Sequence, residues 1–186
     1  MDRIKTILDL KNNFEPLFGD LVEISLFRVE DITDKYIGWL NNPEVTKYSN
    51  QRFQHHSAVS CQQYLGSFQG TPNLFLKIRR RSDKRMVGTM TAYVSLPHRT
   101  ADIGIMVGDQ TAWGKGIGQD AWATLMKWLL SHEAIRKVTA GTMCCNHAMV
   151  KIMEHSGMVL EAIRPKQELF SGQPIDIVYY GMFGVE

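Results

Sequence analysis

Cysteine is scarce in this 186-residue chain, where it occurs only at Cys61, Cys144 and Cys145. These three residues form no even disulfide framework and lack the ligand spacing of a zinc site, so we expect no metal. Such usage is typical of a reducing compartment, and we expect a cytoplasmic protein. The adjacent Cys144 and Cys145 are then expected to pack as small apolar side chains.

An excess of charge of one sign is also absent, because 21 basic residues balance 19 acidic residues to a net charge of +2. This balance does not indicate nucleic acid as a partner. The basic run at residues 79–85 is short and lacks exposed aromatic side chains, which favours a solvated hairpin loop over a phosphate contact. The sequence contains no apolar run of membrane-spanning length, and residues 1–10 lack the apolar centre of a signal peptide.

Repeats, low-complexity tracts and linkers are missing too, and an apolar share of 44% is typical of a globular chain. We expect an extension at residues 1–20, with an apolar helical pattern from Ile4 to Leu10, followed by a single domain at residues 21–186. The patterns predict strands at residues 22–29, 74–80, 86–96, 101–108, 138–143, 158–163 and 175–183, and helices at residues 33–40, 57–68, 120–130 and 146–157. This order predicts a mixed α/β fold, in which the strands at residues 101–108 and 138–143, joined by the helix at residues 120–130, are parallel.

One segment carries the clearest functional signal, namely the run Trp113-Gly114-Lys115-Gly116-Ile117-Gly118 between a predicted strand and a predicted helix. Three alternate glycines allow several backbone N–H groups to converge at a helix start, where donors are unpaired and the dipole is positive. Such a junction can bind a pyrophosphate. The spacing fits neither a Walker A loop nor a dinucleotide fingerprint, and a tight turn without a ligand stays open as an alternative.

The same run resembles the acetyl-CoA pyrophosphate loop of the GCN5-related N-acetyltransferase (GNAT) superfamily, whose pattern is Gln/Arg-x-x-Gly-x-Gly/Ala. Gly116 and Gly118 match, and Trp113 replaces the leading Gln/Arg. The Trp-Gly-Lys-Gly form is similar to the branch that includes ribosomal-protein N-terminal acetyltransferases and nucleotide-sugar N-acetyltransferases. The resemblance implies a mostly antiparallel sheet with a splayed parallel strand pair and helices on both faces.

The resemblance also implies a cofactor site for acetyl-CoA. The pyrophosphate is expected on the amides of Trp113, Gly114, Lys115, Gly116, Ile117 and Gly118. Lys115 either adds charge near the phosphates or is a solvated loop residue. The pantetheine arm is expected along the backbone of Met106 and Val107.

A second segment, residues 146–158, is similar to the family's Asn-x-x-Ala/Ser…Tyr-Glu-Lys-x-Gly-Phe pattern. Asn146 matches the residue that hydrogen-bonds the pantetheine arm. Met153 stands where relatives often have a tyrosine that acts as general acid. Because a thioether cannot donate a proton, that role is excluded at this position.

Acetyl transfer to an amine requires a base for the amine proton and a donor for the oxyanion. We expect the backbone N–H of Val107 to be the donor and Asp102 to be the base. The alternative for Asp102 is a strand-end carboxylate paired with Arg99. Other candidates for the base are His55, His56 and Asp176.

In the family, the segment that follows the helix predicted at residues 33–40 forms one wall of the acceptor pocket. We therefore expect acceptor contacts from Trp39, Asn42, Tyr48, Arg52 and His55, in a stretch that resembles acetyltransferases acting on amino sugars. A closed pocket here would favour a small molecule, and an open groove would favour a polypeptide end.

These patterns predict an acetyl-CoA-dependent N-acetyltransferase that acts on a primary amine of a small molecule, first an amino sugar or nucleotide-linked amino sugar. The alternatives are a protein or peptide N-terminal acetyltransferase and a non-catalytic CoA-binding module. We expect the last strand to be exposed, where it offers an edge for pairing across a two-fold axis in a homodimer.

Overall fold

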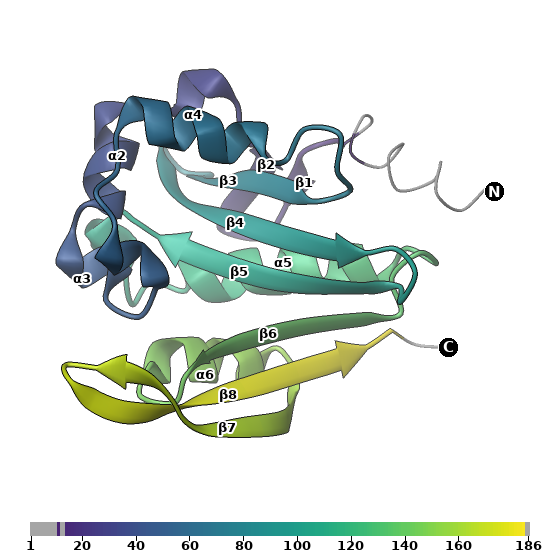
Figure 1. Ribbon diagram of the computed structural model, residues 1–186. Coiled ribbons are helices and arrows are strands. Elements are labelled where there is room, and N and C mark those ends of the chain that lie inside the picture. Colours follow the sequence, from purple (N-terminus) through teal and green to yellow (C-terminus); the bar gives the residue numbers. More distant parts are fainter. Residues whose placement is uncertain (1–10, 12–13, 185–186) are drawn as a thin grey trace.

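The computed structural model of the protein describes residue 11 and residues 14–184, which are built around one eight-stranded sheet (Figure 1). The predicted helical pattern from Ile4 to Leu10 lies outside the described residues. The strands are β1 (Leu17–Phe18), β2 (Val22–Leu26), β3 (Leu74–Arg80), β4 (Met86–Ser95), β5 (Thr100–Val107), β6 (Lys137–Met143), β7 (Val159–Phe170) and β8 (Gln173–Phe183). Their order in the sheet is β1-β2-β3-β4-β5-β6-β8-β7, and every pair is antiparallel except β5 and β6. The expectation of an exposed last strand was wrong, because β8 lies between β6 and β7 and the edge strand at this end of the sheet is β7.

The α-helices are α2 (Asp34–Leu40), α3 (Pro43–Thr46), α4 (Ala58–Gly66), α5 (Ile117–Leu130) and α6 (His147–His155), and three 3-10 turns are η1 (Val29–Asp31), η2 (Asn50–Phe53) and η3 (Gln110–Ala112). Side-chain caps fix several of their starts. Thr33 accepts from the backbone of Tyr36 at the start of α2, and Ser57 forms a capping box with Ser60 at the start of α4.

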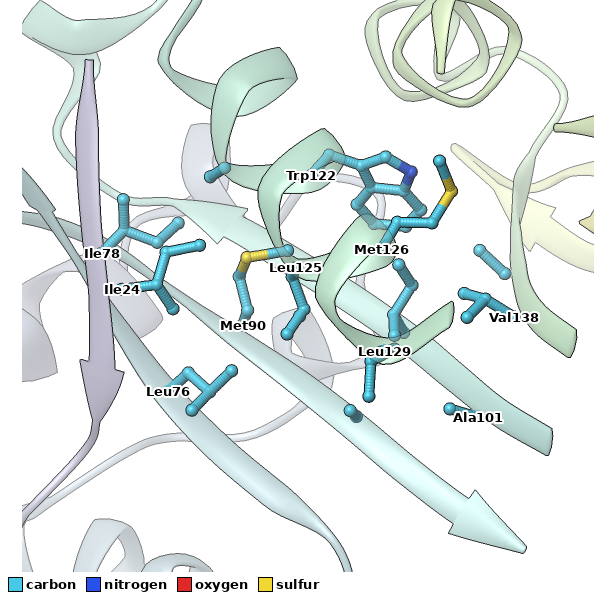
Figure 2. Packing of buried hydrophobic residues seen from close by; sticks show 14 of the residues in the cluster. Ile24, Leu76, Ile78, Met90, Ala101, Trp122, Leu125, Met126, Leu129 and Val138 are labelled. Carbon is cyan, nitrogen blue, oxygen red and sulfur yellow. The ribbon is translucent and has the colours of Figure 1, made fainter. Parts of the chain in front are cut away.

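The main core lies between α5 and one face of the sheet. Leu74, Leu76 and Ile78 alternate along β3 and face the same side, where they meet Trp122 and Leu125 of α5 in one buried cluster. Figure 2 shows the side chains of α5 lying over those of the sheet. Burying each large side chain of this kind contributes roughly 1.5–3 kcal/mol, so this packing fixes where α5 begins relative to the strand ends.

A second, aromatic cluster covers the opposite face of the sheet. Its buried members are Phe27, Tyr36, Trp39, Leu40, Cys61, Phe68 and Phe75. Phe75 follows Leu74 in β3 and therefore points to the other side of the pleat. The cluster holds α2 and α4 on this face, so the sheet is covered on both sides.

The parallel strands β5 and β6 pair over only a short length. Their register runs from Thr100↔Lys137 to Asp102↔Thr139, and β5 then continues to Val107 without a partner on that side. Figure 1 shows the two strands moving apart from this point. This confirms the splayed pair that the family resemblance implied.

The β7–β8 hairpin is longer than the sequence patterns predict. The strand expected at residues 158–163 runs on to Phe170, across a register shift between Arg164 and Glu168. An edge strand tolerates such an irregularity, because its outer groups have no partner to lose. The helix expected at residues 120–130 begins three residues earlier, at Ile117. Within the described part of the chain, no helix is long and apolar enough to cross a membrane.

Candidate active site

A cavity of about 1020 Å³ lies where β5 and β6 separate. Its walls include parts of β4 and β5, the end of β6, the start of α5 and one side of α6. The segment from α3 to η2 adds a further wall with Glu44, Tyr48 and Gln51. Enclosed ligand sites typically have volumes of several hundred to about a thousand Å³, so the cavity is large enough for an extended ligand.

The glycine loop forms one end of this cavity. Gly114 and Gly116 have φ values of 69° and 78°, a region that residues with a Cβ rarely adopt. Gly116 is the N-cap of α5, and no side chain caps the helix there. The first N–H groups of α5 are therefore available to an anion at the positive end of the helix dipole. Gly114, Gly116, Ile117 and Gly118 all line the cavity.

Trp113 connects the loop to the end of β5. Its indole Nε1 donates to the carbonyl oxygen of Val107 at 2.7 Å, and the side chain is 43% exposed. The tryptophan that replaces the family's Gln/Arg thus holds the loop in place through its own hydrogen bond. Lys115, in contrast, is exposed and does not line the cavity.

The first turn of α5 also carries a carboxylate, that of Asp120. It accepts hydrogen bonds from the backbone N–H groups of Asp20, Leu21 and Val22 at 3.1, 2.8 and 3.0 Å. Its charge is therefore compensated on the side of the β1–β2 turn. The carboxylate of Asp120 is thus fully engaged, although it stands in the first turn of α5 next to the glycine loop.

The backbone N–H and carbonyl groups of β5 point alternately toward β4 and toward β6. A Cβ atom on Gly88 of β4 would overlap the carbonyl of Met106, so this carbonyl points toward β4. In an extended strand the groups of the next residue point to the opposite edge. The backbone of Val107 therefore faces the open side between β5 and β6, where its carbonyl already holds Trp113.

Asn146 lies across the opening from β5, at the start of α6. It is the N-cap of this helix, where its Oδ1 accepts from the backbone of Met149, and its Nδ2 donates to Thr142 Oγ1 at 3.1 Å. Asn146, Thr142 and Met149 all line the cavity. Met153, at the family's tyrosine position, is fully buried in the core.

Asp102 occupies the last paired position of β5 before the strands separate. Its Oδ2 accepts from Thr139 Oγ1 at 2.8 Å. Arg99, the alternative partner, donates instead to the backbone carbonyl of Glu133. Although the residue keeps solvent access, the surrounding sheet removes part of the water from its carboxyl group. This desolvation raises the pKa of Asp102, and the hydrogen bond from Thr139 opposes the shift.

Asp102 does not itself line the cavity, but the next two residues, Ile103 and Gly104, do. Gly104 lies two positions further along the strand and so points to the same face as Asp102. The carboxylate of Asp102 therefore lies on the same face of β5 as the wall residue Gly104, two residues before it.

The residues predicted to contact an acceptor are only partly brought together. Tyr48 lines the cavity, and Trp39 instead packs so closely on Gly108 that a Cβ there would overlap its ring. Asn42 caps α3 by accepting from the backbone of Glu44. Arg52 and His55 lie outside the cavity wall.

The other candidate bases have structural partners or lie away from the cavity. His56 is buried, with its ring Nε2 3.3 Å from the carbonyl of Gln51. Asp176 accepts from the backbone of Lys166 in the β7–β8 hairpin. His55 is exposed outside the cavity wall.

Sequence reasoning missed several wall residues because they carry no motif. Glu44, Gln51 and Thr89 come from a short helix, a 3-10 turn and a strand whose facing side cannot be read from spacing. Gln119 could have been found, since it directly follows Gly118. Its Nε2 donates to Ser156 Oγ at 2.7 Å and joins α5 to α6 beside the cavity.

The fold is shared with known acetyltransferases. The acetyltransferase (GNAT family) from Bacillus anthracis is 17% identical with a TM-score of 0.78, over 92% of this chain and 100% of that chain. The ribosomal-protein-S5-alanine acetyltransferase from Vibrio fischeri is 15% identical with a TM-score of 0.79, over 92% and 98%. The spermidine N-acetyltransferase from Vibrio cholerae, in complex with CoA and spermine, is 14% identical with a TM-score of 0.78, over 88% and 96%.

At these identities the structural likeness establishes the fold alone. No curated protein matches the sequence. The family model of the acetyltransferase (GNAT) domain matches residues 22–159, which is most of the chain. Together with the splayed strands and the glycine loop, this match shows that the chain belongs to the GNAT family of acetyl-CoA-dependent N-acetyltransferases.

Proposed function

We propose that the protein transfers the acetyl group of acetyl-CoA to the primary amine of a small molecule, with amino sugars and nucleotide-linked amino sugars as the first acceptor class. One observation carries this proposal: the uncapped start of α5 opens into a cavity that continues between the separated strands to the α3–η2 segment. An extended ligand could therefore place an anionic group at the start of α5 and its other end beside an acceptor near the α3–η2 segment.

The cofactor would lie along this cavity. Backbone N–H groups of residues 114–118 would bind its pyrophosphate, since they stand at the positive end of α5. The backbone of Val107 faces the open edge of β5 and would pair with the pantetheine arm. Asn146 would contact the arm from the other side.

The reaction itself needs few groups from the protein. The amine nitrogen attacks the thioester carbonyl and forms a C–N bond, and the oxyanion accepts from the N–H of Val107. The proton that the amine loses would pass through water to Asp102, because this carboxylate lies five strand residues, roughly 16 Å, from Val107 and outside the cavity wall. Its raised pKa makes it a better base than an ordinary carboxylate. The C–S bond then breaks and CoA leaves as a thiolate, which solvent protonates, because Met153 has no proton to give.

Glu44 adds an acceptor contact. Among the described residues that line the cavity it is the single carboxylate, and it lies on the same segment as Tyr48. The carboxylate of Glu44 suits a protonated amine as it enters, whereas the ring of Tyr48 already has Lys47 Nζ 5.8 Å from its centroid.

Release of free thiol from acetyl-CoA tests the proposal with purified protein and a panel of amino sugars, nucleotide-linked amino sugars, aminoglycosides, polyamines and N-terminal peptides. We expect release with a small amine, and release with peptides alone would overturn the acceptor class. Calorimetry with CoA separates the two halves of the site. Binding without turnover would indicate a CoA-binding module, and the absence of binding would refute the cofactor site.

A further inference from the structure

Two buried hydroxyl groups open into the cavity. Tyr36 of α2 and Thr89 of β4 are only 3% and 6% exposed, and both line the cavity. Neither hydroxyl has a hydrogen-bond partner among the residues that the structure describes. Buried hydroxyls in proteins normally have a partner, because an unpaired one costs free energy. Each of the two can therefore exchange a hydrogen bond with a molecule in the cavity.

Aromatic rings surround these two hydroxyl groups. Besides Tyr36, the rings of Tyr64 and Phe75 line the same cavity. The hydroxyl of Tyr64 is already engaged, since its Oη lies 2.8 Å from that of Tyr93. Tyr64 and Phe75 thus present apolar ring surface, whereas Tyr36 and Thr89 present the open hydroxyl groups. We call Tyr36, Tyr64, Phe75 and Thr89 the hydroxyl recess.

The hydroxyl recess adjoins the proposed reaction centre. Thr89 of β4 is paired with Met106 of β5, and side chains in such a pair have Cβ atoms roughly 5 Å apart. Met106 also packs against the aromatic cluster that contains Tyr36 and Phe75. Because Met106 directly precedes Val107, the body of an acceptor whose amine reaches the thioester would lie in this recess.

The recess itself is uncharged, and the rest of the cavity suits few positive charges. On this face of the sheet, Lys77 is held by both carboxylate oxygens of Asp31, at 2.6 and 2.8 Å, and does not line the cavity. Among the described wall residues, the carboxylate of Glu44 stands against the ammonium groups of Lys47 and Lys151. A polyamine with several positive charges would therefore be repelled more than it is attracted.

We propose, on the basis of the function above, that the hydroxyl recess binds a neutral ring that carries hydroxyl groups. The acceptor is then a monoamine of the amino sugar type and not a polyamine. Tyr36 and Thr89 each exchange a hydrogen bond with a ring hydroxyl of the acceptor. The rings of Tyr64 and Phe75 pack against its apolar C–H groups.

Two substitutions that remove a hydroxyl and little else test this inference. Tyr36→Phe keeps the ring, whose centroid lies 4.9 Å from that of Phe27, and Thr89→Val keeps the branched shape. Each variant should lower kcat/KM for the best amino sugar roughly tenfold, the effect of losing one hydrogen bond. The KM for acetyl-CoA and the lower kcat/KM for spermidine should stay unchanged.

Amino sugars that each lack one ring hydroxyl test the same contact from the side of the acceptor. One of these deoxy analogues should be turned over with equal kcat/KM by the wild type and by Tyr36→Phe. In this pair the hydrogen bond is already missing, so the two changes do not add.

Tyr180→Phe is the matched control for the loss of a buried phenol hydroxyl. Tyr180 is 6% exposed and donates to Glu154 Oε1 at 3.0 Å, and neither residue lines the cavity. Its kcat/KM should equal that of the wild type with every acceptor. Thermal melts of all three variants check that they are folded.

The outcomes separate this inference from the proposed function. A wild-type protein that prefers spermidine to every amino sugar would overturn the recess while acetyl transfer stands. The same holds if either folded variant keeps the wild-type kcat/KM for amino sugars, or loses as much with spermidine. No thiol release with any amine would overturn both.

Discussion

At the scale of single residues, Asp102 combines two requirements in one carboxyl group. As the proposed base it must be ionised to accept a proton, yet its surroundings favour the protonated form. A carboxyl whose pKa is raised on folding binds its proton more tightly in the folded state, so its ionisation above that pKa lowers the free energy of unfolding. Activity and stability therefore place opposite demands on this residue.

Asp102→Asn is accordingly expected to lower kcat/KM by roughly two to three orders of magnitude, the usual contribution of a general base. Its melting temperature at pH 7 should equal or exceed that of the wild type. This advantage should vanish as the pH falls below the ordinary carboxyl pKa, where residue 102 is uncharged in both proteins, folded and unfolded. Thiol release and thermal melts at several pH values check both parts, and a large loss of stability at pH 7 would contradict the assignment.

Trp113→Phe keeps an aromatic ring but removes the hydrogen bond to Val107. A neutral hydrogen bond contributes about 1 kcal/mol, so the KM for acetyl-CoA should rise roughly fivefold with little change in kcat. Trp128→Phe is the matched control, because Trp128 packs against Phe14 and His132 outside the acetyl-CoA cavity. Equal effects in both variants would refute the role of the Trp113 indole.

Tyr48 and Trp39 show what the sequence can say about single residues. Both are aromatic and both follow the first strand, and spacing alone made them equal candidates for the acceptor site. The difference arises from Gly108, whose missing Cβ lets Trp39 pack on the end of β5. That contact joins residues 69 positions apart, and no local pattern predicts it.

At the scale of elements, the first turn of α5 is stabilised through Asp120. Asp120→Ala leaves the N–H groups of Asp20, Leu21 and Val22 without their acceptor, and water replaces it only in part. We expect a loss of about 2 kcal/mol in the free energy of unfolding by urea. Asp20→Asn is the control, because only the backbone of Asp20 takes part. A loss of similar size in Asp20→Asn would argue against the Asp120 contacts.

Elements bounded by turns were predicted well from the sequence. β3 has the predicted limits, residues 74–80, since its alternating side chains end at a charged hairpin. The extent of β7 was not predictable, because Pro165 and the charged residues around it resemble a loop. β8 pairs with β7 on both sides of them, up to Arg164 and again from Glu168, and residues 165–167 form the irregularity between these two stretches.

At the scale of the whole molecule, the sheet is incomplete between β5 and β6. A bound pantetheine arm would occupy this gap, so CoA should stabilise the fold by mass action. At a hundredfold excess over Kd the gain is about 2.7 kcal/mol, which corresponds to roughly 5–10 °C in melting temperature for a chain of this size. Thermal melts with CoA and with pantetheine alone check this. An equal shift by pantetheine would exclude the glycine loop as the main contact.

The overall topology could be predicted in part. The order of helices and strands indicated a mixed α/β fold, and the unit from β5 through α5 to β6 indicated one parallel pair. The separation of β5 and β6 after Asp102 depends on how α5 and α6 pack on the sheet, because these helices contact strands that are distant from them in the sequence. Only the resemblance of the glycine loop to a known family predicted it.

The projecting hairpin has a consequence for how this enzyme could diversify. Its tip lies beyond the end of β6, and the core cluster includes none of residues 164–176. Replacing Phe170, whose ring stacks on that of Tyr48, or changing the length of the turn at Ser171-Gly172, would therefore cost little in folding. The glycine loop, in contrast, is joined to α5 and β5 and has little freedom to vary. Under the proposed function, selection or a designed library could thus vary the surroundings of Tyr48 through the hairpin while the glycine loop stays unchanged.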